Sequence, residues 1–127
     1  GLEGLVSLYH DQALIALNDE KKLDEGISEL KRSLTIDEEN AEAWRLLAQA
    51  YDRKEQDGLA RYATAEYNFQ IGNRQQALVF AMRAREKLEK STPEWRRATD
   101  IVLASSPTKD DLKDLANEGS IRRGTLR

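Results

Sequence analysis

Apolar side chains recur at intervals of three and four residues along most of this 127-residue chain, and short polar turns interrupt the pattern. This spacing places them on one face of an α-helix, which turns once in about 3.6 residues. Strand signals are nearly absent, so the pattern predicts an all-α fold. In the first segment, residues 2–18, we expect the inward face to carry Leu2, Leu5, Val6, Tyr9, Ala13, Ala16 and Leu17.

Capping residues mark where later helices begin and end. Asn40 and Asn73 are good N-caps, and Gly72 ends the helix that precedes Asn73. Thr92-Pro93 combines a cap with a proline at the first helical position, and Thr108 opens one more short helix. These signals predict about six helices of similar length and a short C-terminal helix.

The length fits a single domain, which we expect to be a helical repeat domain over residues 1–104. Residues 105–127 are expected to form a C-terminal segment with a short helix and a tail, frayed from Ser120 to Arg127 unless it docks. The 20 basic and 23 acidic side chains are interspersed, so no charged field favours nucleic acid. No apolar run approaches the roughly 18 residues of a membrane helix, so no direct membrane insertion is expected.

The chain offers no recognisable catalytic, cofactor-binding or metal-binding set. It has no cysteine, and His10 is its only histidine, so the two histidines and a carboxylate that a gluzincin site needs are not present. Asp110 and Asp111 lie in a polar segment where nothing raises a pKa for acid chemistry. We expect no enzyme activity, a surface position for His10, and core positions for Trp44 and Trp95.

Two helix patterns resemble the tetratricopeptide repeat, whose helix pairs recur about every 34 residues. The order Trp44, Leu47, Ala48, Tyr51 is similar to the first helix of such a repeat. The pattern of the second helix occurs twice, starting at Gly26 and at Ala77, which are 51 residues apart. This distance is about one and a half repeats, so the fourth helix is expected to close one hairpin and open the next. The resemblance implies a solenoid of stacked helix hairpins.

A more particular resemblance depends on short motifs in a fixed order. They are Ala65-Glu66-Tyr67, Gly72-Asn73, Gln76-Ala77-Leu78, Arg83-Ala84, Ser91-Thr92-Pro93-Glu94-Trp95 and Arg97-Ala98-Thr99-Asp100-Ile101. Together they resemble the tetratricopeptide tail of BepA-like (YfgC-like) bacterial periplasmic zinc metalloproteases, over roughly residues 13–101. The resemblance implies a non-catalytic module that recruits a protein or peptide beside an upstream protease domain in the periplasm. The alternative is a free-standing scaffold or adaptor, for which a cytoplasmic location is expected.

The chain starts Gly1-Leu2-Glu3, without a signal peptide or an initiating methionine, and we expect it to be a piece of a longer protein. Stacked hairpins bind their partners on a continuous concave surface, to which each repeat contributes side chains. Arginines 74, 83, 85, 96 and 97 alternate with glutamates, which predicts a solvated, salt-bridged surface. The expected groove residues are Asp11, Ile15, Arg45, Gln49, Asp52, Tyr62, Glu66 and Phe69.

Overall fold

The computed structural model describes residues 2–17 and 19–126, and within these ranges it contains seven α-helices, one short 3-10 helix and no strand. The prediction of an all-α chain is confirmed. Gly1, Asn18 and Arg127, which belong to the expected N-terminal start, first helix and tail, lie outside the described residues. The elements are α1 (Leu2–Ala16), α2 (Glu20–Ile36), α3 (Ala41–Arg53), α4 (Asp57–Gln70), α5 (Arg74–Lys87), α6 (Pro93–Ala104), α7 (Lys109–Asn117) and η1 (Arg123–Leu126).

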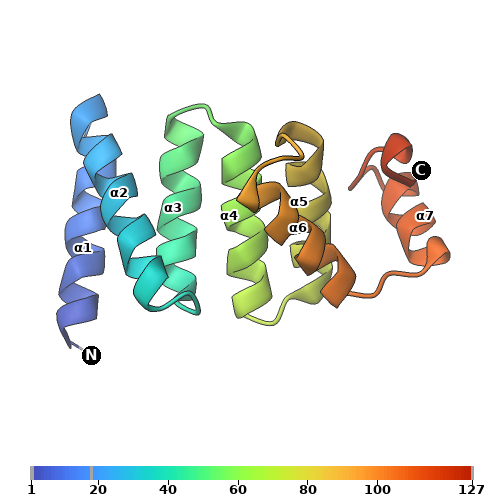
Figure 1. The fold of residues 1–127 in the computed structure, drawn as a ribbon, viewed down its shortest axis with the longest axis horizontal. Coiled ribbons are helices and arrows are strands. Elements are labelled where there is room, and N and C mark those ends of the chain that lie inside the picture. Colours follow the sequence, from blue (N-terminus) through green and yellow to red (C-terminus); the bar gives the residue numbers. More distant parts are fainter. Residues whose placement is uncertain (1, 18, 127) are drawn as a thin grey trace.

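Helices α1, α3, α4, α5 and α7 follow one another along the long axis of the molecule, and α6 lies across α4 and α5 (Figure 1). Helices α1, α2 and α3 contact one another, as do α4, α5 and α6, and α3 packs along α4 to join the two groups. Helix α4 therefore contacts α3 on one side and α5 on the other, as do the other inner helices with their own neighbours. The two copies of the repeated pattern, which start at Gly26 and Ala77, lie on α2 and α5, the middle helix of each group.

The predicted N-caps form. The side-chain oxygen of Asn40 accepts the amide of Ala43 at 3.1 Å, and Thr92, Asn73 and Thr108 cap α6, α5 and α7 in the same way. Each cap supplies a partner for a backbone N–H that the first turn of a helix leaves free. These helix starts are therefore fixed by hydrogen bonds between residues only three positions apart.

The core differs between the two groups of helices. Around α1 to α4 it contains larger side chains, among them Leu30, Leu46 and Leu47. Between α4, α5 and α6 it consists mainly of alanines, with Ile101 as the one larger buried side chain in the cluster. Small side chains let helix backbones approach closely, so α4 and α5 pack along most of their lengths. Trp44 is buried as predicted.

Helix α1 turns a different face inward from the one predicted. Leu5, Val6 and Tyr9 are exposed, as are the other members of the expected inward stripe: Leu2, Ala13, Ala16 and Leu17. The buried side chains are Leu14 and Ile15 together with Asp11. The cause lies on α2, where Gly26 has no side chain and a Cβ there would meet Ile15 at 3.3 Å. The backbone of α2 can therefore approach α1 most closely at Leu14 and Ile15.

The C-terminal segment is attached to the rest of the fold. Leu115 and Ala116 of α7 and Ile121 beyond it are buried against three side chains of α5. The Nε of Arg83 donates a hydrogen bond to the carbonyl of Ser120 at 2.8 Å. Ser120 and Ile121 therefore meet the condition under which fraying was not expected, because they dock on α5, which offers an apolar surface and a donor. No helix among the described residues has the length and apolarity needed to cross a bilayer.

Candidate functional site

A cleft of about 360 Å³ lies where α2, α3, α4 and α6 meet. Its walls combine apolar and aromatic side chains with charged ones at the rim. Such a mixture of an apolar floor and a few polar groups is typical of binding sites. The lining residues are Lys31, Leu34, Thr35, Glu38, Trp44, Leu47, Tyr51, Tyr62, Glu66, Glu94 and Arg97.

Two aromatic side chains pack against each other in the cleft. The rings of Trp44 and Tyr62 meet edge to face, with centroids 5.7 Å apart and an interplanar angle of 86°. The indole Nε1 of Trp44 also donates a hydrogen bond to the carbonyl of Glu38 at 2.8 Å. Because the rings pack edge to face and the indole N–H has a hydrogen-bond partner, both side chains have little conformational freedom. The floor is therefore already in place before any ligand arrives.

A buried carboxylate forms one wall. Glu66 accepts a hydrogen bond from the hydroxyl of Tyr62 at 2.9 Å and two from Arg97, from Nε and Nη2, each at 3.0 Å. The Glu66 side chain is 5% exposed, whereas that of Arg97 is 39% exposed. Burial, reinforced by the nearby carboxylate, raises the pKa of Tyr62, and the hydrogen bond to Glu66 raises that of Arg97. The hydroxyl stays protonated and the guanidinium stays charged.

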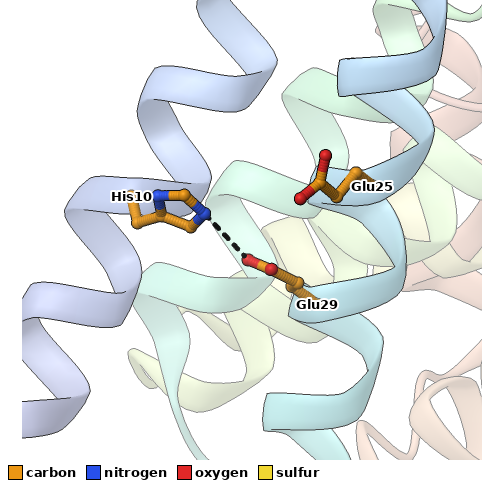
Figure 2. Close-up of side chains that lie close together, drawn as sticks. All are labelled: His10, Glu25 and Glu29. Atoms are coloured by element: carbon orange, nitrogen blue, oxygen red, sulfur yellow. Dashed lines mark ion pairs between the residues drawn. The ribbon is translucent and has the colours of Figure 1, made fainter.

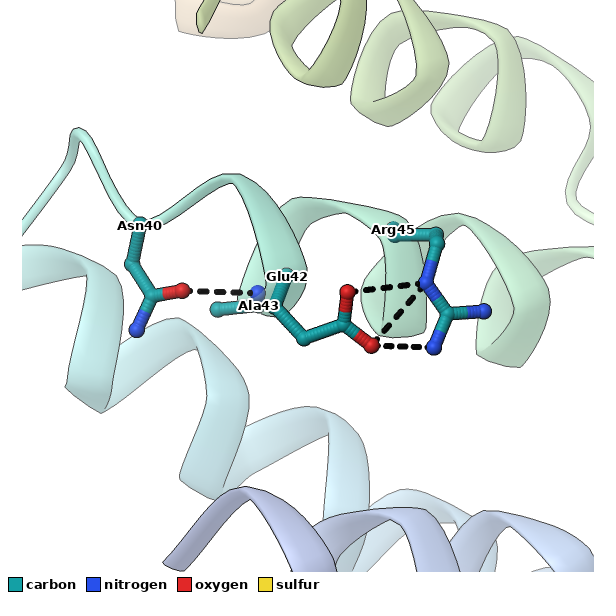
Figure 3. A network of polar contacts seen from close by, with 4 residues as sticks. All are labelled: Asn40, Glu42, Ala43 and Arg45. Atoms are coloured by element: carbon teal, nitrogen blue, oxygen red, sulfur yellow. Dashed lines mark hydrogen bonds and ion pairs between the residues drawn. The ribbon is translucent and has the colours of Figure 1, made fainter. Parts of the chain in front are cut away.

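Only part of the predicted groove lines this cleft. Tyr62 and Glu66 do, whereas Phe69, one turn further along α4, lies under the guanidinium of Arg97 at 5.2 Å instead. Arg45 extends from α3 toward Glu42 and forms an ion pair with it (Figure 3). The other two predicted residues of α3, Gln49 and Asp52, are exposed and are not among the lining residues.

Asp11 and Ile15 require a correction. Both were expected to face an open groove, but Asp11 is 0% exposed and Ile15 is 4% exposed. The close approach of α2 at Gly26 covers them, so they belong to the seam between α1 and α2. Because both side chains are buried, neither is accessible to a binding partner in the folded chain.

Four of the five arginines expected on a solvated surface lie over aromatic rings. Arg85 is 4.8 Å from the ring centroid of Trp95, which is half-buried rather than in the core. The other three arginine–ring contacts are Arg74 and Arg97 over Phe69, and Arg83 over Phe80. A guanidinium over a ring gains both packing and electrostatic attraction. These four guanidinium groups therefore pack against rings, and that of Arg97 also pairs with Glu66.

Sequence reasoning did not assign Lys31 or Arg97 to a site. Lys31 comes from α2 and Arg97 from α6, and no spacing within a single helix indicates that they share a cleft. Trp44 and Tyr51 were assigned to the core alone, although their edges also line the cleft. The signals in the sequence that pointed here were the aromatic residues of α3 and the groove positions Tyr62 and Glu66 predicted on α4.

The side chains that could hold a metal lie elsewhere, on α1 and α2. Within the part of the chain that the structure describes, His10, Glu25 and Glu29 are the one group with suitably close ligand atoms (Figure 2). None of the three lines the cleft. The cleft and this group are therefore two separate features.

Comparison with known proteins gives no family assignment. No family model, no curated protein and no solved structure matches the chain.

Proposed function

We propose that this chain is a non-catalytic protein–protein interaction module of the tetratricopeptide type, and that the cleft between α2, α3, α4 and α6 binds a peptide segment of its partner. The observation that carries the proposal is the preformed aromatic floor of that cleft, with Trp44 and Tyr62 locked against each other. Aromatic side chains give large contact areas and lose little conformational entropy on binding.

The cleft is lined by two cations, Lys31 and Arg97, and by three carboxylates, Glu38, Glu66 and Glu94, of which Glu66 is already paired with Arg97. Arg97 uses Nε and Nη2 for Glu66 and keeps a further nitrogen, Nη1, on a partly exposed guanidinium. Lys31, on α2, lines the same cleft and is exposed. An apolar side chain on the floor, next to a carbonyl or carboxylate oxygen that accepts from these cations, fits this arrangement. We propose an apolar peptide segment with an acidic neighbour as the ligand.

The helical row supports the solenoid part of the proposal, because from α1 to α6 each helix contacts those next to it in sequence. The ordered motifs from Ala65 to Ile101 favour the recruiting tail of a BepA-like periplasmic zinc metalloprotease. A free-standing scaffold is the alternative. The sequence of the full-length gene product separates the two, since the first requires an upstream His-Glu-x-x-His helix.

A random-peptide library tests the binding proposal directly. Peptides selected on the wild-type chain should lose affinity for Thr35→Arg, because a long side chain at this exposed rim position fills the cleft. Lys31→Glu should also weaken binding of the acidic peptides by reversing the rim charge. Lys90→Glu, an equal charge reversal at an exposed position outside the cleft, is the matched control.

Fluorescence anisotropy of labelled peptides gives the dissociation constants, and circular dichroism checks that each variant is folded. Equal affinity of the selected peptides for wild type and Thr35→Arg would show that they bind elsewhere. The proposal for the cleft would then be wrong.

A further inference from the structure

Three side chains from α1 and α2 bring metal-binding atoms together. His10 lies on α1, and Glu25 and Glu29 lie one turn apart on α2, so that both carboxylates point toward α1 (Figure 2). One ligand atom from each residue lies within 4.8 Å of the other two. The Nε2 of His10 is 3.6 Å from an oxygen of Glu29. A nitrogen and two carboxylate oxygens thus converge between two helices.

A fourth, buried carboxylate adjoins this group. Asp11 is 0% exposed, and no hydrogen-bond donor reaches either of its carboxylate oxygens. Buried carboxylates normally have a donor or a cation as a partner. The seam between α1 and α2 therefore contains a buried carboxyl group without a hydrogen-bond partner, next to His10 in sequence.

We propose that His10, Glu25 and Glu29 bind a divalent transition-metal ion such as Zn²⁺ at the seam between α1 and α2, beside the buried carboxyl of Asp11, which has no hydrogen-bond partner. An imidazole nitrogen combined with carboxylate oxygens favours Zn²⁺ and its neighbours in the first transition row over Mg²⁺ and Ca²⁺. Three protein ligands leave a position open for water.

The distances require only a small adjustment. Ligand atoms around a tetrahedral Zn²⁺ are about 3.4 Å apart, given bonds of about 2.0–2.2 Å. His10 and Glu29 already approach this spacing, and the side chains of His10 and Glu25 are exposed and free to rotate. Glu25 must leave its ion pair with Lys22, which is 3.5 Å long and solvent-exposed. Such pairs contribute little, so the exchange is not costly.

A bound ion would connect α1 to α2. Helix α1 buries few side chains and has many exposed apolar ones, so a link to α2 adds a constraint that packing does not supply. An ion that binds the folded chain and not the unfolded one raises the melting temperature. Metal binding would be independent of peptide binding, because none of the three proposed metal ligands lines the peptide cleft.

The test uses the tag-free chain of 127 residues, stripped of metal by a chelator and then titrated with ZnCl₂. His10 is the only histidine, so its ring signals in the proton NMR spectrum report on ligation without ambiguity. We expect these signals to shift until one equivalent has been added, with a rise in Tm. MgCl₂ should produce neither effect.

Substitutions separate the site from unspecific binding. Glu29→Gln should lower the affinity for Zn²⁺ by at least about tenfold, as losses around metal sites do, and His10→Ala should abolish the rise in Tm. Glu20→Gln, which removes an exposed carboxylate from the first turn of the same helix, is the control and should bind as wild type does. Glu25→Gln, at an exposed position, repeats the test if Glu29→Gln does not fold.

Ring signals of His10 that do not respond to Zn²⁺ would overturn the proposal. So would an equal rise in Tm for wild type and His10→Ala, because the ion would then bind elsewhere.

Discussion

Replacing Arg97 by alanine leaves the carboxylate of Glu66 buried without its cation. Glu66 is 5% exposed at its side chain and loses two of its three hydrogen bonds in this variant, keeping only the one from Tyr62. Removing one partner of a buried ion pair costs about 3–5 kcal/mol. The contact of the guanidinium with the ring of Phe69 adds about 0.5–1 kcal/mol. We expect a loss of about 4 kcal/mol, a large part of a typical free energy of unfolding.

Urea unfolding at neutral pH measures this loss, with Arg96→Ala as the control. Arg96 is the neighbouring residue on α6, and it is exposed, so its replacement should change the free energy of unfolding by no more than about 0.5 kcal/mol.

A cost below about 1 kcal/mol for Arg97→Ala would refute the reasoning. The pair of Glu66 and Arg97 would then behave as a solvent-exposed ion pair does. The wall of the cleft would in that case not depend on it.

Two further predictions concern α1 and a turn, and both use thermal or urea unfolding. Leu14→Ala should lower the free energy of unfolding by about 2–5 kcal/mol, because Leu14 is buried. Leu5→Ala, at an exposed position, should change it by less than about 0.5 kcal/mol. Equal losses for the two variants would mean that α1 packs through its other face. Gly72→Ala should cost about 1 kcal/mol, because the φ of +82° is unfavourable for alanine although its Cβ would meet nothing within 4 Å. Gly4→Ala lies inside α1, and its Cβ would also meet nothing within 4 Å, so this variant should be as stable as wild type or more stable by up to about 1 kcal/mol. If Gly4→Ala lowered the stability, the positive φ would not explain the cost expected for Gly72→Ala.

The helices and their ends could be predicted because the interactions that define them are local. Asn40 and Thr108 cap their helices through residues three positions away, and Gly72 adopts the positive φ that ends α4. Such contacts need nothing from the rest of the chain. The small-residue pattern that starts at Gly26 and Ala77 was equally visible, since it reflects how closely a neighbouring helix can approach.

The inward face of α1 could not be predicted, because apolar residues occur on almost every side of that helix. Leu5 and Tyr9 fit a helical stripe as well as Leu14 and Ile15 do, so periodicity alone did not discriminate between them. The choice depended on α2, whose backbone comes nearest where Gly26 lacks a side chain.

The sequence by itself determined the helical class, the caps and the absence of a protease motif, because these depend on residue types at short spacings. The tertiary structure decided which side chains share a site. The pairing of Glu66 with Arg97 joins residues 31 positions apart, and the group of His10 with Glu29 joins two helices. Contacts of this kind arise only when whole helices pack, since the position of each side chain then depends on the rotation and approach of its neighbours.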